Sequence, residues 1–195
     1  MTKGLRVSGV STVFRRKALD HHNDLPVRQP PNVNDIRELG MTGPWRSKSG
    51  GLLSVPFALS YPQTMDIFDY DPSELDRVPR DIRGLRMFVL EDIPMGGVGG
   101  GEFHRLRIEI VFTVKGKVRW VCDDLYGGRK EFTPMRDCIL HFPPFILHTM
   151  ESMEHGSSVV VIANTLYDPD DARTYDTYSV AEFRSMQEHY RALGG

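Results

Sequence analysis

The sequence predicts an all-β domain, an antiparallel sandwich or small barrel, with one short helix at its end. Two observations predict this fold: short apolar runs recur from residue 83 onward, and glycine-centred turns separate several of them. The runs are rich in Val, Ile and Phe and are bounded by Gly, Pro or Asp. They read "LRMFVLE", "RIEIVFTV", "KVRWVCDD", "CILHFP" and "SSVVVIANT".

Residues 1–82 come first and differ from the predicted barrel. The stretch "LPVRQPPNVNDIRELGMTGPW" is rich in Pro, Asn and Gly and shows little periodicity. "GGLLSVPFALSY" predicts one strand, which Pro56 places at an edge or a bulge, and "DPSELDRV" predicts a short helix or turn. Large apolar side chains favour an ordered arm that packs on the barrel or on a partner subunit. They are Trp45, Phe57, Tyr61, Phe68 and Tyr70.

Residues 83–178 form the predicted barrel. "KGK" joins two of its runs in a tight hairpin, and "DDLYGGRKEF" contains another glycine-centred turn. The glycine run "GGVGGGEFHR" has unusual backbone freedom, so we expect it to approach a ligand or to form a wide turn at the barrel mouth.

Residues 179–195 form the predicted C-terminal helix. Its apolar residues recur at helical spacing, Ser179 can cap its start, and Gly194 can end it. The apolar positions are Val180, Phe183, Met186, Tyr190 and Leu193.

Composition argues against several classes of partner. The chain has 24 basic and 26 acidic residues, a balance that disfavours a nucleic-acid binder. It contains no apolar run long enough to span a membrane, and its first residues lack the apolar stretch of a secretory signal. Cys122 and Cys138 lie in strand-like runs, which predicts buried reduced thiols and a cytoplasmic setting.

Two motifs carry a resemblance to a known superfamily. Glu102-Phe103-His104 is followed by Glu109 and then Gly116, and the second stretch, "PPFILH", ends at His148. This spacing resembles the cupin motifs, in which His-x-His precedes Glu and Gly, and Pro-x-Gly-x-x-His follows. Two positions depart from that pattern, since Glu102 replaces a His and Phe145 replaces a Gly. The resemblance implies a cupin (RmlC-like) jelly-roll barrel with an N-terminal arm, a short C-terminal helix, and a homodimer.

A narrower resemblance covers residues 83 to about 185. "RGLRMFVLEDIP", "GGEFHR", "FPPFILH" and "LYDPDDARTYDTYSVAEF" are similar to segments of the WxcM-like sugar 3,4-ketoisomerases, which act on dTDP-4-keto-6-deoxyglucose. The segment between the first strand and Glu102 is shorter than in that group, and its aromatic and Arg residues are missing. The resemblance implies a sugar isomerase of deoxysugar biosynthesis that moves a keto group on a nucleotide-linked sugar.

Such a reaction transfers a proton through an enediol. Glu102 and His104 lie two residues apart on a predicted strand, so both point to one face, with His104 as the base and Glu102 as its acid partner. No cofactor is needed. Candidate residues for binding the sugar nucleotide lie on or near strands that line the barrel, because a diphosphate favours Arg. They are Glu109, His148, Arg107, Arg119 and Tyr126.

The same side chains support two alternatives. Glu102, His104, Glu109 and His148 occupy the cupin ligand positions, and two imidazoles with carboxylates suit Fe(II), Mn, Ni or Zn. A divalent transition metal bound by His104, Glu109 and His148 would give a dioxygenase or lyase. Replacement of the first His by Glu102 is also compatible with a non-catalytic small-molecule binder.

Other residues remain weaker candidates. Alternation in "CILHFPP" places His141 on the face of Ile139, and the pattern does not decide which face looks inward. Trp120 is a core residue or a stacking wall. His21 and His22 lie in the arm and are expected to be solvated, and the acidic "DPDDAR" is typical of a turn and helix start.

Overall fold

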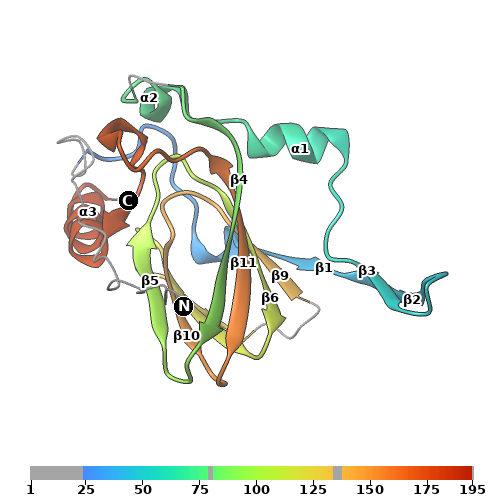
Figure 1. Cartoon of the computed structure of the whole chain (residues 1–195). Helices are drawn as coiled ribbons and strands as arrows, with labels where there is room; N and C mark the ends of the chain where they lie inside the picture. Colours follow the sequence, from blue (N-terminus) through green and yellow to red (C-terminus); the bar gives the residue numbers. More distant parts are fainter. Residues whose placement is uncertain (1–23, 79–80, 134–137, 195) are drawn as a thin grey trace, which may run out of the picture.

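Two antiparallel sheets face each other in the computed structural model, which describes residues 24–78, 81–133 and 138–194 (Figure 1). The first sheet has the order β1 (Arg37–Gly40), β9 (Cys138–Phe142), β6 (Glu109–Lys115), β11 (Ser157–Thr165) and β4 (Arg83–Ile93). The second has the order β12 (Tyr178–Ser179), β5 (Val98–Phe103), β10 (Leu147–Ser152), β7 (Val118–Asp123) and β8 (Arg129–Phe132). This arrangement confirms the predicted all-β jelly-roll barrel.

The core lies between the two sheets and follows from strand alternation. Every second residue of β6, β7, β9 and β11 points inward, and these side chains form one buried cluster. Its members include Val111, Val118, Trp120, Cys122, Leu140, Phe142, Val159 and Val161. Cys122 is a buried free thiol, and burial raises its pKa to about 12. The side chain of Cys138 lies outside the described residues.

The described part of the arm is built into the barrel. β1 pairs with β9 in an antiparallel register that sets Arg37 opposite His141. The short 3₁₀ helix η1 (Val33–Asp35) precedes β1, and its Val33 joins the core cluster. The arm therefore supplies one edge strand of the first sheet, which its sequence did not indicate.

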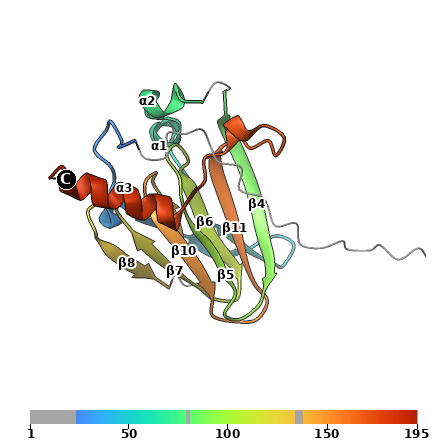
Figure 2. The same ribbon diagram turned by 90° about the vertical axis from the view of Figure 1, so that its left-hand side faces the viewer.

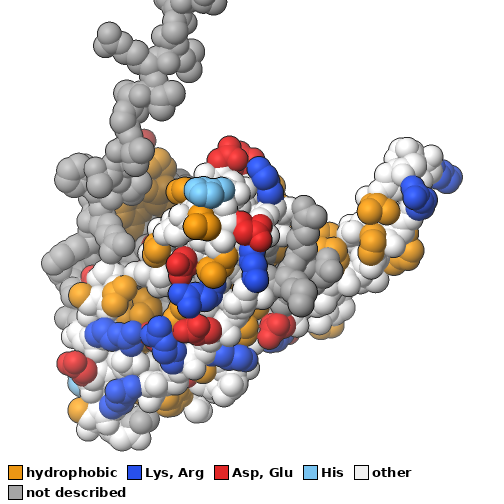
Figure 3. Space-filling view, turned by 90° about the horizontal axis from the view of Figure 1, so that it is seen from below, with side chains coloured by type: hydrophobic (Ala, Val, Ile, Leu, Met, Phe, Trp, Pro, Cys, Tyr) orange, Lys and Arg blue, Asp and Glu red, His pale blue; other side chains and the backbone are white. Residues whose placement is uncertain are grey.

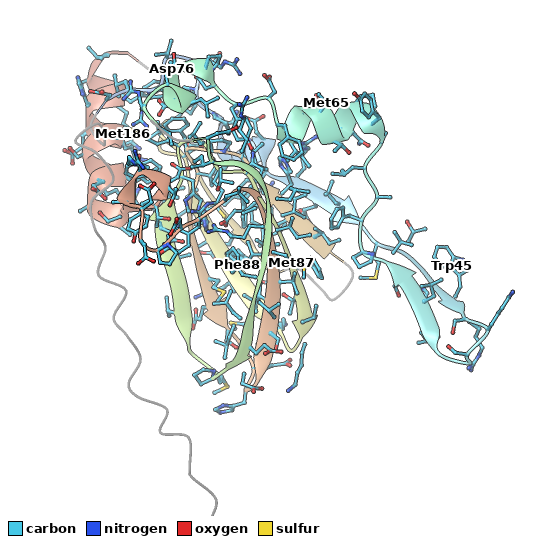
Figure 4. The ribbon with its side chains drawn as sticks, turned by 45° about the horizontal axis from the view of Figure 1, so that its top comes forward. Trp45, Met65, Asp76, Met87, Phe88 and Met186 are labelled. Atoms are coloured by element: carbon cyan, nitrogen blue, oxygen red, sulfur yellow. The ribbon has the colours of Figure 1, made fainter. Side chains whose placement is uncertain are left out.

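A hairpin of β2 (Thr42–Arg46) and β3 (Leu52–Val55) projects from the barrel. Figures 3 and 4 show it reaching away from the main body, and Figure 4 labels Trp45 on it. Trp45 is 48% exposed and Leu52 is 72% exposed. The hairpin thus carries apolar side chains that the described chain does not cover.

The arm returns along the top of the barrel through α1 (Tyr61–Ile67) and α2 (Pro72–Leu75). Ile67 packs with Ile110 and Ile139, which face outward from the first sheet. Asp71 caps α2 by accepting from the backbone N–H of Ser73, as the Asp start signal predicted.

The C-terminal helix α3 (Val180–Ala192) follows β12 and a second 3₁₀ helix, η2 (Ala172–Thr174). Ser179 and Glu182 form a capping box at its start. Figure 2 shows α3 crossing the strands of the second sheet. Its Phe183 and Met186 are buried against Phe103 of β5. No helix in the described part of the chain is long and apolar enough to cross a membrane.

Candidate active site

Four side chains singled out by the sequence meet between the sheets. His148 of β10 pairs with Glu102 of β5, and His104 follows directly after β5. Glu102 and His104 share a face because a strand alternates, whereas Phe103 points outward beneath α3. Glu109 begins β6 in the opposite sheet. The two cupin motifs therefore converge on one buried position, with both sheets contributing.

Glu109 lies at the centre of this cluster and is 5% exposed. Its Oε1 is 3.4 Å from His104 Nε2, and its Oε2 is 3.4 Å from His148 Nε2. Arg107 Nη1 lies 3.2 Å from the same Oε1. One carboxylate is thus shared by two imidazoles and a guanidinium.

Backbone carbonyl groups fix the tautomers of both imidazoles. His104 Nδ1 donates to the carbonyl oxygen of Asp176 at 2.5 Å, and His148 Nδ1 donates to that of Ile146 at 3.1 Å. A carbonyl oxygen only accepts, so each Nδ1 carries a hydrogen and each Nε2 faces Glu109. The two Nε2 atoms are the positions at which protons can be exchanged.

Burial and charge act in opposite directions on this cluster. Burial raises the pKa of Glu109, but the charges and hydrogen bonds of His104 and His148 outweigh burial and hold it well below its ordinary value. Burial lowers the pKa of His148, but the hydrogen bond and charge of Glu109 outweigh that and raise it. The environment therefore favours a carboxylate at Glu109 beside a protonated His148.

Aromatic side chains form one wall of the site. The Phe142 ring stacks on the His148 ring at a centroid distance of 5.2 Å and an interplanar angle of 7°. Trp120 lies 6.2 Å from His148 and 5.2 Å from Phe142. Trp120 is a core residue that packs beside the rings of His148 and Phe142, which holds the imidazole in place and excludes water from its apolar side.

The glycine run is divided between a tight turn and a strand, and does not form one wide turn. Gly96 and Gly97 lie at the turn before β5, where the backbone N–H of Gly97 donates to the carbonyl oxygen of Pro94 at 2.8 Å. Gly99 to Gly101 lie within β5, whose register with β10 shifts between His148 and Thr149. A Cβ at Gly100 would lie 2.8 Å from the carbonyl oxygen of His148, and Gly100 has a φ of 73°. Glycine is required because the backbone bulges closely against β10, which aligns Glu102 with His148.

Asp176 holds the loop that carries Arg107. Its carboxylate accepts from the backbone N–H groups of Arg105, Leu106 and Arg107, while its carbonyl oxygen accepts from His104. Sequence reasoning missed this residue, because nothing near position 176 indicates contacts with residues so far away along the chain. Arg107 side-chain groups also reach Thr165.

Phe145 links the second motif to the first. Its backbone N–H donates to the carbonyl oxygen of His104 at 2.7 Å, and its φ is 60°. A positive φ explains why glycine is usual at this position. Phe145 is held there by packing beneath α3 and by Arg105, whose guanidinium lies 5.2 Å from the ring centroid.

Two predicted substrate-binding residues lie away from this cavity. Arg119 points outward from β7, because its neighbours Val118 and Trp120 fill the core, and it pairs with Glu151 at 2.5 Å. The hydroxyl of Tyr126 donates to the carbonyl oxygen of Pro30. Arg119 is therefore placed on the outer face and Tyr126 against the arm, rather than beside the imidazoles.

His141 also lies on an outer face. Leu140 and Phe142 point into the core, so His141 between them points outward, where its Nε2 lies 3.2 Å from Arg37 Nη2. Burial, together with the charge of Arg37, lowers its pKa to about 4. His21 and His22 lie outside the described residues.

The donor set also fits a transition metal. The ligand atoms of Glu102, His104 and His148 all lie within 4.8 Å of one another. Donation from each Nδ1 to a carbonyl group is the outer-shell arrangement that orients Nε2 toward a metal. Arg107 Nη1, however, lies 3.4 Å from His104 Nε2, which places a permanent positive charge beside the position that a cation would take.

Comparison with known proteins gives a family and a fold. The family described as FdtA, WxcM-like, C-terminal matches residues 73–182. A search of curated proteins found no match. Among solved structures, the chain is similar to a 3,4-ketoisomerase from Helicobacter canadensis at 17% identity, covering 79% of this chain and 98% of that chain with a TM-score of 0.55.

Two further structures show the same similarity. QdtA, a sugar 3,4-ketoisomerase from Thermoanaerobacterium thermosaccharolyticum in complex with TDP, matches at 14% identity over 83% of this chain and 98% of that chain, with a TM-score of 0.54. WlaRB, a TDP-quinovose 3,4-ketoisomerase from Campylobacter jejuni, matches at 16% identity over 78% of this chain and 99% of that chain, with a TM-score of 0.53. At these identities the likeness establishes a common fold.

Proposed function

The chain belongs to the FdtA (WxcM-like, C-terminal) family, and we propose on that basis that it is a sugar isomerase. Its reaction moves a keto group by one carbon on a nucleotide-linked deoxy-keto-sugar. The observation that carries this proposal is the carboxylate of Glu109 between the two Nε2 atoms, because it stabilises an imidazolium whenever either ring takes a proton.

The reaction needs only proton transfers. His104 Nε2 removes the proton from the carbon next to the carbonyl, while Glu102 protonates the carbonyl oxygen, and an enediol results. The imidazolium then returns its proton to the former carbonyl carbon. Glu102 takes the hydroxyl proton from the neighbouring oxygen, which becomes the new carbonyl. Atoms and electrons balance without an oxidant or a cofactor.

The remaining groups bind and orient the sugar in this proposal. His148 and Arg107 are hydrogen-bond donors to sugar oxygens, and both are held by Glu109. Phe142 and Trp120 limit water on one side. Relatives of similar structure support the substrate class, since their names describe TDP-sugar ketoisomerases and one was solved with TDP.

Exchange with solvent tests the proposal directly. The chain is incubated with dTDP-4-keto-6-deoxyglucose in D₂O, and the sugar is followed by proton NMR. We expect the 3-keto product and deuterium on the carbon that exchanges its proton. If neither product nor deuterium appears, the ketoisomerase proposal fails for this substrate, and the non-catalytic binder gains support.

A metal-dependent cupin enzyme, a dioxygenase or lyase, is the second candidate. It is favoured by the cluster of Glu102, His104 and His148 described above. Metal analysis of chain purified without chelators separates the two candidates. One bound iron or manganese per chain that disappears in His148→Ala supports the second candidate, and isomerisation that persists after chelation contradicts it.

We also propose that the chain works as a cytoplasmic homodimer. An isolated two-stranded hairpin is marginally stable in water, and Trp45 and Leu52 on this one are exposed. A second copy of the chain would cover them. Light scattering of the wild type and of a Trp45→Ser, Leu52→Ser double variant tests this: a monomeric wild type contradicts the proposal.

A further inference from the structure

Arg86 of β4 lies on the inner wall, two strands away from Glu109. Ala163 of β11 pairs with Arg86 on one side and with Glu109 on the other. Directly opposed residues project from the same face of a sheet, so all three point inward. Strands are about 4.8 Å apart, which separates the backbones of Arg86 and Glu109 by about 10 Å. Because Ala163 bears only a methyl group, its side chain leaves space between the longer side chains of Arg86 and Glu109.

Arg86 lacks the partners that a buried guanidinium normally has. Its Nε is buried without a hydrogen-bond partner, and no carboxylate of the described residues forms an ion pair with it. Its guanidinium carbon lies 5.2 Å from the ring centroid of Tyr167 and 5.4 Å from that of Phe88, which is labelled on β4 in Figure 4. Aromatic rings hold the cation in place, but they leave a charged donor unsatisfied.

The neighbouring acid does not neutralise Arg86. Both oxygens of Glu109 already contact other groups, namely the two imidazoles and Arg107. Burial lowers the pKa of Arg86 to about 10, and the charge of Arg107 adds to that effect. The guanidinium remains protonated at neutral pH, so this side of the barrel carries a positive charge that has no ion-pair partner among the described residues.

A pocket gives solvent access to Arg86. It has a volume of about 450 Å³ and is lined by Arg86, Tyr167, Leu166, Pro169, Asp81 and Asp168. Its two acids are already engaged, because Asp81 pairs with Arg83 at 2.9 Å and Asp168 accepts from the backbone N–H of Asp170 at 3.0 Å. A molecule in this pocket meets Arg86 as a cation that has no ion-pair partner among the described residues.

We propose that Arg86 binds an oxyanion of the substrate and thereby places the sugar ring over Ala163, facing Glu109. The oxyanion is a phosphate of the nucleotide diphosphate or a carboxylate on the sugar, since a guanidinium recognises both through the same paired N–H donors. The identity of the reacting sugar rests on the proposed function, whereas the oxyanion site rests on the geometry of Arg86 alone.

Calorimetric titration of the full chain tests the site with three probes: TDP, inorganic pyrophosphate and glucuronate. We expect the wild type to bind at least one of them and Arg86→Gln to bind it about 10- to 100-fold more weakly, with partial rescue in Arg86→Lys. Loss of TDP and pyrophosphate binding identifies the diphosphate as the ligand group. Loss of glucuronate binding identifies a sugar carboxylate.

Arg119→Gln is the matched control, because this arginine lies on the outer face and pairs with Glu151. It should bind every probe as the wild type does. The proposal is overturned if no probe binds the wild type, if Arg86→Gln binds every probe within about twofold of it, or if Arg119→Gln loses the same affinity.

Stability gives an independent readout. Arg86 has no ion-pair partner to lose among the described residues, and Met can keep the packing against the rings of Phe88 and Tyr167. Arg86→Met should therefore unfold at the same urea concentration as the wild type or at a higher one. A lower midpoint would show that Arg86 serves the fold, and would overturn the proposal. Failure of deuterium exchange in the wild type, with TDP binding that still depends on Arg86, would remove the proposed function and leave this site standing.

Discussion

The barrel wall carries buried charges on both sides, and the two sides hold them differently. Outside the barrel, Arg105 makes two 2.5 Å contacts with the carboxylate of Glu74 and a third with the carbonyl oxygen of Asp24. Inside, Glu109 is shared by three groups at 3.2 to 3.4 Å. Burial alone therefore does not mark the site, whereas a carboxylate shared by several donors does.

Two of the three buried histidines of the described residues, His141 and His148, repeat this contrast. His141 faces outward beside the cation of Arg37, and its pKa is lowered to about 4. His148 faces inward beside Glu109, and its pKa is raised. The outer imidazole is kept neutral, while the inner one is kept ready to carry a proton.

Removal of the proposed base, His104, should have the largest effect. His104→Ala should lower the rate of deuterium uptake into the keto-sugar by about 10²- to 10⁴-fold, because the proposed base is lost. His141→Ala, on the outer face, should retain the wild-type rate. Equal losses in the two variants would erase the distinction between inner and outer histidines.

Breaking the outer ion pair should affect stability instead. Glu74→Ala leaves Arg105 buried without its carboxylate, and the free energy of unfolding should fall by about 3–5 kcal/mol in urea titrations. Asp81→Ala removes the exposed partner of Arg83 and should leave the midpoint of the urea transition nearly unchanged. A Glu74→Ala chain as stable as the wild type would contradict the structural role of this pair.

Because of His141, acid should destabilise the folded chain over a defined pH range. The pKa of His141 is about 4 in the folded chain and 6.5 without the fold, so the unfolded chain binds the extra proton between these values. Stability should therefore fall as pH drops from 6.5 to 4, by up to about 3 kcal/mol from this group. Unfolding of His141→Gln across this range should show a smaller decline; an unchanged decline would contradict the assignment.

The smallest effect is expected at Arg119. This side chain is partly exposed on the outer face and pairs with Glu151 and Glu131. Arg119→Gln should change the rate of deuterium uptake by less than about twofold and leave the midpoint of the urea transition nearly unchanged. A tenfold loss of rate would return Arg119 to the candidate site.

The sequence predicted the parts of the barrel that depend on local patterns, namely apolar alternation within a strand and the spacing of residues within a motif. Apolar alternation indicates β6, β7, β9 and β11, and motif spacing brings Glu109 and His148 together. Outward placement of Arg119 was available from the pattern too, because apolar residues flank it at the core positions Val118 and Trp120.

The remaining features depend on contacts between distant segments. The five glycines of residues 96–101 show no strand pattern, so β5 became visible only through its pairing with β10. β1 is defined by its partner β9, roughly a hundred residues further along the chain. Asp176 and Arg86 act through neighbours on other elements, and a single sequence does not reveal which element those neighbours occupy.

The most direct test of the central claim is deuterium uptake by dTDP-4-keto-6-deoxyglucose with the Glu109→Gln chain. The amide keeps the shape of the side chain but cannot stabilise an imidazolium on either side of it. With the folded state verified by its urea transition, we expect uptake at least about 100-fold slower than in the wild type. Uptake at the wild-type rate would show that the shared carboxylate plays no part in proton transfer.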